Sequence, residues 1–152
     1  MAADFTHLDE NGNARMVDVS QKPRVRRTAA AQGKIYLSPL TIKKIQTNTI
    51  AKGNVLATAR IAGIMAAKRC SDLIPLTHLI EIEHVEVNFS VEEDGILITA
   101  RSVCTDKTGI EMESLTAVTI AALTIYDMCK AVDTAMHIES VRLLEKTKEQ
   151  TI

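Results

Sequence analysis

The sequence predicts an α+β fold in which two long helices cover one antiparallel sheet. Three observations indicate this: a hairpin signal in mid-chain, an apolar helical pattern on either side of it, and a β pattern towards each end. The resulting order, β-α-β-β-α-β, is that of a ferredoxin-like sandwich. The chain has 152 residues, of which 46% are hydrophobic and 24% charged, so it suits one domain with a real core.

The first 32 residues show little periodicity, and we expect them to form an extended or loop-like basic arm. A short strand is expected over residues 34–37. Ser38 followed by Pro39 is typical of an N-cap and the first helical position, so a short helix should run to about residue 47.

A longer helix is expected over residues 55–69, because Asn54 is a good N-cap and the following run is apolar or small almost all round. Such a helix must be covered on most sides. Residues 71–80 read as a loop. A hairpin is expected over residues 81–105, with its turn at Asp94-Gly95.

The last long helix is expected to begin at a capping box formed by Thr108 and Glu111, and to run to about Asp133. A final strand is expected over residues 136–145. We therefore predict one domain over residues 1–152, which divides into an arm (1–32), a ferredoxin-like core (33–146) and a tail (147–152).

Charge is distributed unevenly along the chain, although the net charge is only −1. Residues 1–14 carry −3, residues 15–69 carry +11 and residues 70–152 carry −9. Such an arrangement favours an anionic ligand, self-association between opposite faces, or both. A nucleic-acid partner is disfavoured despite the basic segment, because only 3% of residues are aromatic and few bases could be stacked.

Membrane, secretory and metal-binding classes are also disfavoured. No apolar run approaches the roughly 20 residues of a membrane span. The N-terminal residues are polar and acidic, unlike a signal peptide. Three cysteines lie far apart, and no His/Cys cluster has ligand spacing, so we expect no metal and a reducing, cytoplasmic location.

Asp127 and Lys130 are the first candidate site residues, since they lie three apart on one face of an apolar helix. Two interpretations are equally weighted on spacing alone: an ordinary surface ion pair, or a carboxylate and an ammonium whose pKa values are tuned for chemistry. Lys52, before Gly53 at a helix start, is either part of an anion cradle or of a hinge. His78 is a lone loop histidine, more often a surface residue than a catalyst.

Glu111 and Glu113 flank Met112 at the start of the last helix. Capping explains Glu111 better than function does, because acids in a first turn suit the helix dipole. Capping does not explain Glu113.

Five stretches together resemble one family, that of cyclic pyranopterin monophosphate synthase, also called molybdenum cofactor biosynthesis protein C. The stretches are MVDVS (16–20), ARIAGIMAAKR (59–69), DLIPL (72–76), KTGIEME (107–113) and ALTIYDMCKA (122–131). They occur in the family's order, and the resemblance runs from about residue 6 to residue 146.

The resemblance implies a lyase in molybdenum cofactor biosynthesis. Such enzymes convert the 3′,8-cyclised dihydro-GTP intermediate to cyclic pyranopterin monophosphate and release pyrophosphate. The family uses no metal or organic cofactor in this step. It has a ferredoxin-like fold and assembles as a homohexamer, a trimer of dimers with active sites between subunits. It acts on a small-molecule substrate, with no nucleic acid and no membrane.

The resemblance also implies roles for individual residues. Asp127 matches the family's general acid/base, and Lys130 matches the lysine that orients or protonates the reacting atoms. Lys52 and His78 match further catalytic residues. The matched substrate-binding positions are Arg27, Thr77, Glu111, Met112, Glu113 and Lys146.

The chain departs from the family pattern at a few positions. Thr77 and Leu79 replace a cysteine and a proline around the histidine, Thr28 replaces a glutamate, and a glycine-free tail follows Lys146. Two hypotheses therefore remain: an active synthase, or a non-catalytic or impaired paralogue that serves as a nucleotide-binding or interaction subunit.

Overall fold

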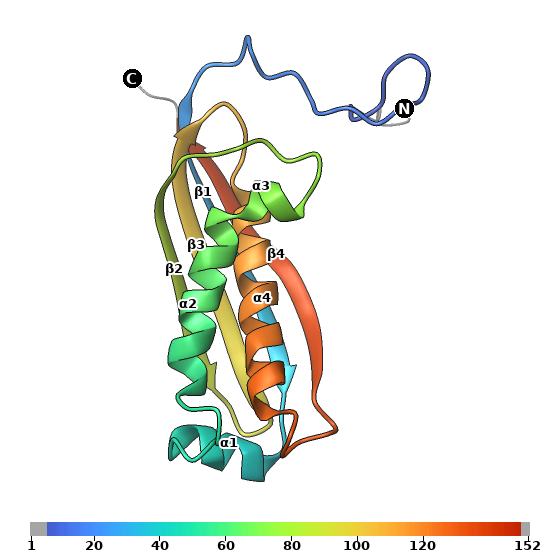
Figure 1. Ribbon diagram of the computed structural model, residues 1–152. Coiled ribbons are helices and arrows are strands. Elements are labelled where there is room, and N and C mark those ends of the chain that lie inside the picture. Colours follow the sequence, from blue (N-terminus) through green and yellow to red (C-terminus); the bar gives the residue numbers. More distant parts are fainter. Residues whose placement is uncertain (1–5, 150–152) are drawn as a thin grey trace.

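A computed structural model describes residues 6–149, which form one sheet with the long helices on a single face (Figure 1). The sheet is antiparallel with strand order β2-β3-β1-β4. The fold is thus α+β, as predicted. The elements are β1 (Val25–Tyr36), α1 (Pro39–Gln46), α2 (Val55–Lys68), α3 (Cys70–Leu73), β2 (Ile82–Val91), β3 (Gly95–Asp106), α4 (Glu111–Cys129) and β4 (His137–Glu149).

The central strand β1 begins at Val25 and is much longer than the predicted strand at residues 34–37. The extended or loop-like arm expected over residues 1–32 therefore ends earlier than predicted, because residues 25–32 belong to the strand. Residues 25–32 pair with β3 instead, and residues 26–32 pair with β4 as well. Alanines have low intrinsic strand propensity, which hid this strand. Ala29 and Ala31 are nonetheless fully buried beneath the helices, and that packing decides the outcome.

The β2–β3 hairpin and helices α1 and α2 confirm the predicted elements within a residue or two. Ser38 caps α1 by accepting a hydrogen bond from the Thr41 amide, and Asn54 caps α2 by accepting one from the Ala57 amide. The predicted loop after α2 contains one short helix, α3.

Helix α4 is shorter than predicted at both ends. Its N-cap is Ile110, which provides no side-chain cap, so the predicted capping box between Thr108 and Glu111 was wrong. The Glu111 carboxylate lies against Gly109 and pairs with Lys146 instead. Strand β4 runs past residue 145, so residues 147–149 of the expected tail are strand, while 150–152 lie outside the described residues.

The two long helices pack closely on each other and on the sheet. Gly63 of α2 faces the Ala117 carbonyl oxygen of α4, where an added Cβ would lie only 2.9 Å away. Ala59 on α2 and Ala121 on α4 are fully buried alongside. Small residues therefore allow the helix backbones to approach, as the alanine-rich pattern predicted. No helix within residues 6–149 is long and apolar enough to cross a membrane.

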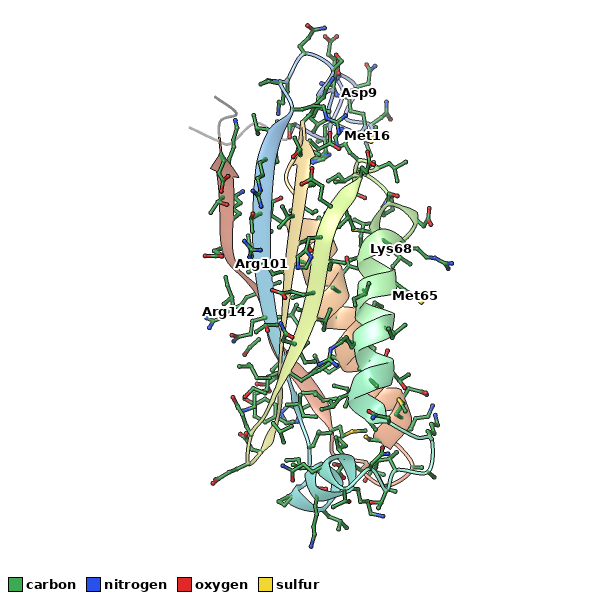
Figure 2. The ribbon with its side chains drawn as sticks, turned by 90° about the vertical axis from the view of Figure 1, so that its left-hand side faces the viewer. Asp9, Met16, Met65, Lys68, Arg101 and Arg142 are labelled. Atoms are coloured by element: carbon green, nitrogen blue, oxygen red, sulfur yellow. The ribbon has the colours of Figure 1, made fainter. Side chains whose placement is uncertain are left out.

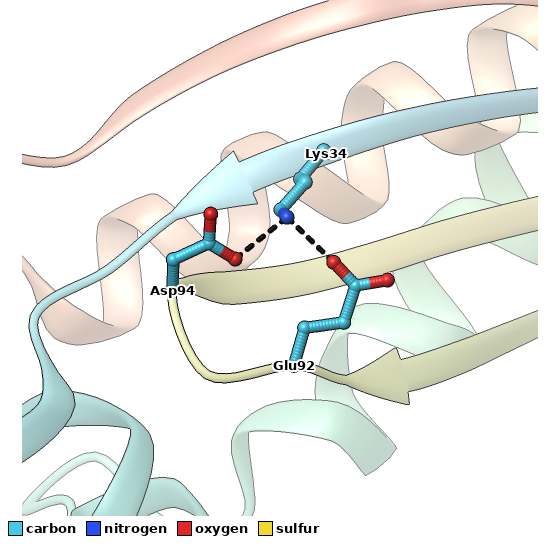
Figure 3. A network of polar contacts seen from close by, with 3 residues as sticks. All are labelled: Lys34, Glu92 and Asp94. Atoms are coloured by element: carbon cyan, nitrogen blue, oxygen red, sulfur yellow. Dashed lines mark hydrogen bonds and ion pairs between the residues drawn. The ribbon is translucent and has the colours of Figure 1, made fainter.

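An ion cluster ties the hairpin turn to the central strand (Figure 3). The Lys34 Nζ of β1 donates to Glu92 at 2.5 Å and to Asp94 at 2.6 Å. The hydrogen bond to Asp94 has the largest effect on the Lys34 ammonium, and together with the bond to Glu92 it raises the pKa above its usual range. The Lys34 ammonium also lies 4.8 Å from the ring centre of Tyr36, which stacks on His137 of β4. The cluster thus connects β1, β4 and the β2–β3 turn.

Replacing Gly63 with valine should destabilise the fold by about 1–3 kcal/mol, because the new side chain must displace the α4 backbone. Urea unfolding measures the effect. Ala57→Val is the matched control, since it places the same side chain at an exposed position of α2. It should cost less than about 1 kcal/mol. Equal unfolding free energies for the two variants would contradict the close helix contact.

Candidate active site

The residues predicted for the site form two groups, one at each end of α4. Asp127, Lys130 and Lys52 lie at its C-terminal end, and the remaining predicted residues surround its N-terminal end. Asp127 is fourteen residues beyond Glu113, which at 1.5 Å per residue corresponds to about 21 Å along the helix axis. A single chain therefore does not bring the two groups together.

At the C-terminal end of α4, one carboxylate lies between two ammonium groups. Asp127 Oδ2 accepts a hydrogen bond from Lys52 Nζ at 2.8 Å, and Oδ1 is 2.9 Å from Lys130 Nζ. Lys52 also donates to the Asp127 main-chain carbonyl at 2.9 Å. Gly53, at φ +105°, provides the left-handed turn that brings Lys52 from the α1–α2 loop to this helix.

The two lysines hold the Asp127 carboxyl strongly in its ionised form. The hydrogen bond from Lys52, followed by that from Lys130, lowers its pKa from 3.8 to about 2. All three side chains remain roughly half exposed, so a ligand can reach them. Spacing alone predicted the Asp127–Lys130 pair, but it did not reveal that Lys52 completes the group.

At the N-terminal end of α4 lies a cavity of about 420 Å³. Helix α4 supplies Glu111, Met112 and Glu113, and the loop after α3 supplies Thr77 and His78. The opposite wall comes from the N-terminal segment, defined here as residues 6–22, through Thr6, His7, Val17, Val19 and Lys22. The sequence prediction missed this wall, although the MVDVS motif lies within it.

Glu113 is the most unusual group in this cavity. It is 3% exposed, and its Oε2 has no hydrogen-bond partner among the described residues. Burial, with a smaller effect from the charge of Glu111, raises the pKa of the Glu113 carboxyl from 4.5 to about 7. Near neutral pH this carboxyl is therefore poised between a donor and an acceptor.

His78 and Thr77 are both anchored to main-chain carbonyls. The His78 Nε2 donates to the Val17 carbonyl at 2.7 Å. The Thr77 hydroxyl donates to the Ile74 carbonyl at 2.9 Å and so closes a local turn. Leu79 is 82% exposed and packs little against the chain.

A second, cation-rich cavity of about 260 Å³ adjoins the first and is separated from it by Gly109 and Glu111. Arg27, Lys146 and Lys148 line it. Arg27 is fixed by hydrogen bonds to the Asp106 and Lys107 carbonyls, and Lys146 Nζ pairs with Glu111 Oε1 at 3.0 Å. Lys148 was not among the predicted residues. It lines the cavity because β4 continues beyond residue 145 and pairs Lys148 with Arg27.

Metal ligands are not grouped in the structure: within residues 6–149, no three His, Cys, Asp or Glu side chains are close enough to hold an ion. Cys70, Cys104 and Cys129 are buried and unpaired, and burial raises the pKa of each thiol.

These features define a small α+β protein with clusters of charged and polar side chains at both ends of one helix. The comparison with known families is specific: residues 16–149 match the model described as the MoaC family. The chain belongs to the MoaC family, and the resemblance predicted from five short motifs is confirmed.

Several relatives cover nearly the whole chain. It is 54% identical over 145 residues to a cyclic pyranopterin monophosphate synthase of Heliobacterium modesticaldum, covering 94% of this chain and 91% of that protein. Identity to the synthase of Natranaerobius thermophilus is 48% over 153 residues, covering 99% and 96%. A molybdenum cofactor biosynthesis bifunctional protein of Chlorobaculum tepidum is 53% identical over 144 residues, 95% of this chain, but the chain spans only 46% of that protein.

The raised pKa of Glu113 predicts how stability varies with pH. Because the folded protein holds this proton more tightly than the unfolded chain, the unfolding free energy should fall as pH rises from about 4.5 to about 7. Glu113 should contribute up to roughly 1.4 kcal/mol of this fall per pH unit. Glu113→Gln should remove that contribution, as measured by urea titrations at several pH values.

The exposed acid Glu93, on the hairpin turn, provides the control. Glu93→Gln should leave the pH dependence of the wild type in place. If Glu113→Gln and wild type show parallel pH profiles, Glu113 is ionised in the folded protein.

Proposed function

We propose that this chain is a cyclic pyranopterin monophosphate synthase, a lyase of molybdenum cofactor biosynthesis. The substrate is the 3′,8-cyclised dihydro-GTP triphosphate, and the second product is pyrophosphate. The observation that carries the proposal is the family match over residues 16–149, in a chain whose Asp127 lies between two lysines. The printed names of near-full-length relatives support the reaction.

The fold proposed for this activity is the ferredoxin-like sandwich, in a single domain. It is supported by the element order, with α1 and α3 as additions, and by the strand order β2-β3-β1-β4. We further propose a cytoplasmic location, supported by three cysteines that are buried and unpaired.

Each active site is proposed to combine two copies of the chain. The support is the distance of about 21 Å between the Asp127 group and the Glu113 cavity, which one reaction centre cannot span within a chain. A twofold axis across α4 would set the C-terminal end of one copy beside the N-terminal end of the other, forming two equivalent sites. Exposed apolar side chains on α2 and α4, including Ile61, Met65 and Leu123, support such a contact. The full assembly is proposed to be a homohexamer, a trimer of dimers.

Asp127, Lys52 and Lys130 are proposed as the acid–base group. Formation of a cyclic monophosphate from a triphosphate requires a substrate hydroxyl oxygen to attack the α-phosphorus, while the bond to the β-phosphate breaks and pyrophosphate leaves. Asp127 is ionised, which suits it to accept the hydroxyl proton. The lysine ammonium groups can donate to reacting oxygen or nitrogen atoms and stabilise developing negative charge. His78 is proposed as a further proton carrier.

The two cavities are proposed to hold the two parts of the substrate. The first suits a guanine-derived ring, because Glu111 and Glu113 offer carboxyl groups to its amide and amine edge, beside Met112 and Thr77. The second suits phosphates, since Arg27 and Lys146 line it. Glu111 pairs with Lys146 in the structure, so phosphate binding would compete with Glu111 for this ammonium.

Pyrophosphate release from the purified cyclised GTP intermediate tests the proposal directly. We expect release that falls by at least about a hundredfold in Asp127→Asn, because the proton acceptor is lost. If the wild-type protein releases pyrophosphate no faster than the protein-free control, the enzyme assignment is overturned and a binding subunit remains.

Mixing two inactive variants tests the shared site. Asp127→Asn and His78→Ala change opposite ends of α4, so a mixed dimer carries one intact site. Co-expression in equal amounts should restore roughly a quarter of wild-type activity, since half of the dimers are mixed and each has one good site of two. Asp127→Asn with Lys52→Met is the control, because both changes fall at the same end and no intact site can form. No recovery in the first mixture would contradict a site between subunits.

Lys148 is expected to contribute to phosphate binding, in place of the family's glycine-rich tail. Lys148→Met should raise the KM for the triphosphate substrate by up to about tenfold, with a smaller effect on kcat. The difference should shrink at high salt, because screening weakens the interaction. Lys43→Met, at an exposed position of α1, is the control and should leave KM unchanged.

A further inference from the structure

The N-terminal segment is held to the domain by polar contacts and contributes no residue to the buried core of the described chain. Its own shape is held by turns in which Asp9 accepts hydrogen bonds from the Asn11 and Asn13 amides, and Asp18 accepts one from the Ser20 amide. A segment held in this way depends on few contacts for its position.

Two side chains of the domain hold main-chain carbonyls of this segment. Lys107 Nζ donates to the Ser20 carbonyl at 2.8 Å, and His78 Nε2 donates to the Val17 carbonyl at 2.7 Å. Just beyond the segment, Arg24 donates to the Thr105 carbonyl at 2.9 Å. Of these three donors, only His78 also lines the first cavity, at the N-terminal end of α4.

The contact with Val17 determines which nitrogen of His78 carries hydrogen. A main-chain carbonyl can only accept, so Nε2 must be the protonated nitrogen. In the neutral ring, Nδ1 then has a free lone pair. No hydrogen bond involves Nδ1 within the described part of the chain, and His78 lines the cavity that contains Glu113.

We propose that the Val17 main-chain carbonyl is a positioning group for His78, which it holds in the Nε2–H tautomer so that Nδ1 is the nitrogen presented to the substrate. This inference rests on the proposed function, since it assumes that His78 acts in the reaction. The N-terminal segment is then part of the catalytic apparatus as well as a wall of the cavity.

The arrangement allows one proton to move from the substrate to His78. Nδ1 takes a proton from a substrate N–H or O–H, the bond to that hydrogen breaks, and Nε2 keeps its own hydrogen. The ring becomes an imidazolium, and the hydrogen bond to the Val17 carbonyl becomes charge-assisted and stronger. Val17 therefore stabilises the charged form of His78 without itself changing protonation.

Two amide replacements of His78 separate positioning from proton transfer. The glutamine side-chain amide reaches the place of Nε2, so His78→Gln should keep the bond to Val17 and lose Nδ1. The asparagine amide reaches only the place of Nδ1, so His78→Asn should lose the bond to Val17. Hydrogen exchange of the substrate-free, full-length protein should be about tenfold faster at residues 17–20 in His78→Asn and unchanged in His78→Gln.

Nitrogen NMR of ¹⁵N-histidine-labelled protein determines directly which ring nitrogen of His78 carries hydrogen. The neutral His78 ring should show a single form with hydrogen on Nε2, identified by the resonances lost in His78→Gln. In turnover assays both variants should lower kcat, and only His78→Asn should also raise KM. His84→Gln is the matched control, since His84 lies exposed on β2, and it should change none of these measurements.

The outcomes separate this inference from the proposed function. An Nδ1–H tautomer, or equal exchange in the two amide variants, would overturn the positioning role whatever the activity. The tautomer and exchange results could be as expected while the wild-type protein shows no turnover. That outcome would overturn the synthase assignment, and with it the role of Nδ1 as a proton acceptor. Normal turnover in His78→Gln would show that Nδ1 takes no part in the reaction.

Discussion

The close contact between α2 and α4 determines where every proposed catalytic residue lies. Gly63 allows the α2 backbone to approach the Ala117 carbonyl, while α4 rests on buried alanines of β1 and α2 packs on β2. Helix α4 is thereby fixed as a rigid rod of 19 residues with functional groups at each end. A loop meets each end of α4: the α1–α2 loop brings Lys52 to the C-terminal end, and the loop after α3 brings His78 to the N-terminal end. Figure 2 shows the helices on one side of the sheet, with Lys68 of α2 on the side of that helix away from the sheet.

The two ends of α4 differ in their electrostatics, and the difference suits different tasks. At the exposed C-terminal end, two ammonium groups keep Asp127 ionised. At the N-terminal end, burial favours the neutral form of Glu113. At neutral pH the exposed Asp127 is therefore fully ionised, while the buried Glu113 lies near its pKa, so the two carboxyls differ in protonation state.

N-caps and helical spacing were enough to predict α1, α2 and the Asp127–Lys130 pair, and strand alternation with the Asp94-Gly95 turn was enough to predict the hairpin. The full length of β1 could not be predicted, because its alanines become strand residues only through burial under α4. The capping box failed because the Glu111 carboxylate found a partner 35 residues away, in Lys146. Lys52 was expected at the site only through the family resemblance. The positions of Lys148 and Val17 could not be predicted from spacing, since each depends on a contact with a residue distant in sequence.

Strand β4 forms one open border of the sheet, and such borders invite pairing with foreign strands. Its pairing with β1 shifts register twice, and Ser140 adopts a left-handed conformation near the second shift. These irregularities twist the border, while Lys146 and Lys148 add charge to it. The lysines that line the second cavity therefore also disfavour pairing of this border with a foreign strand, and so protect the molecule from aggregation.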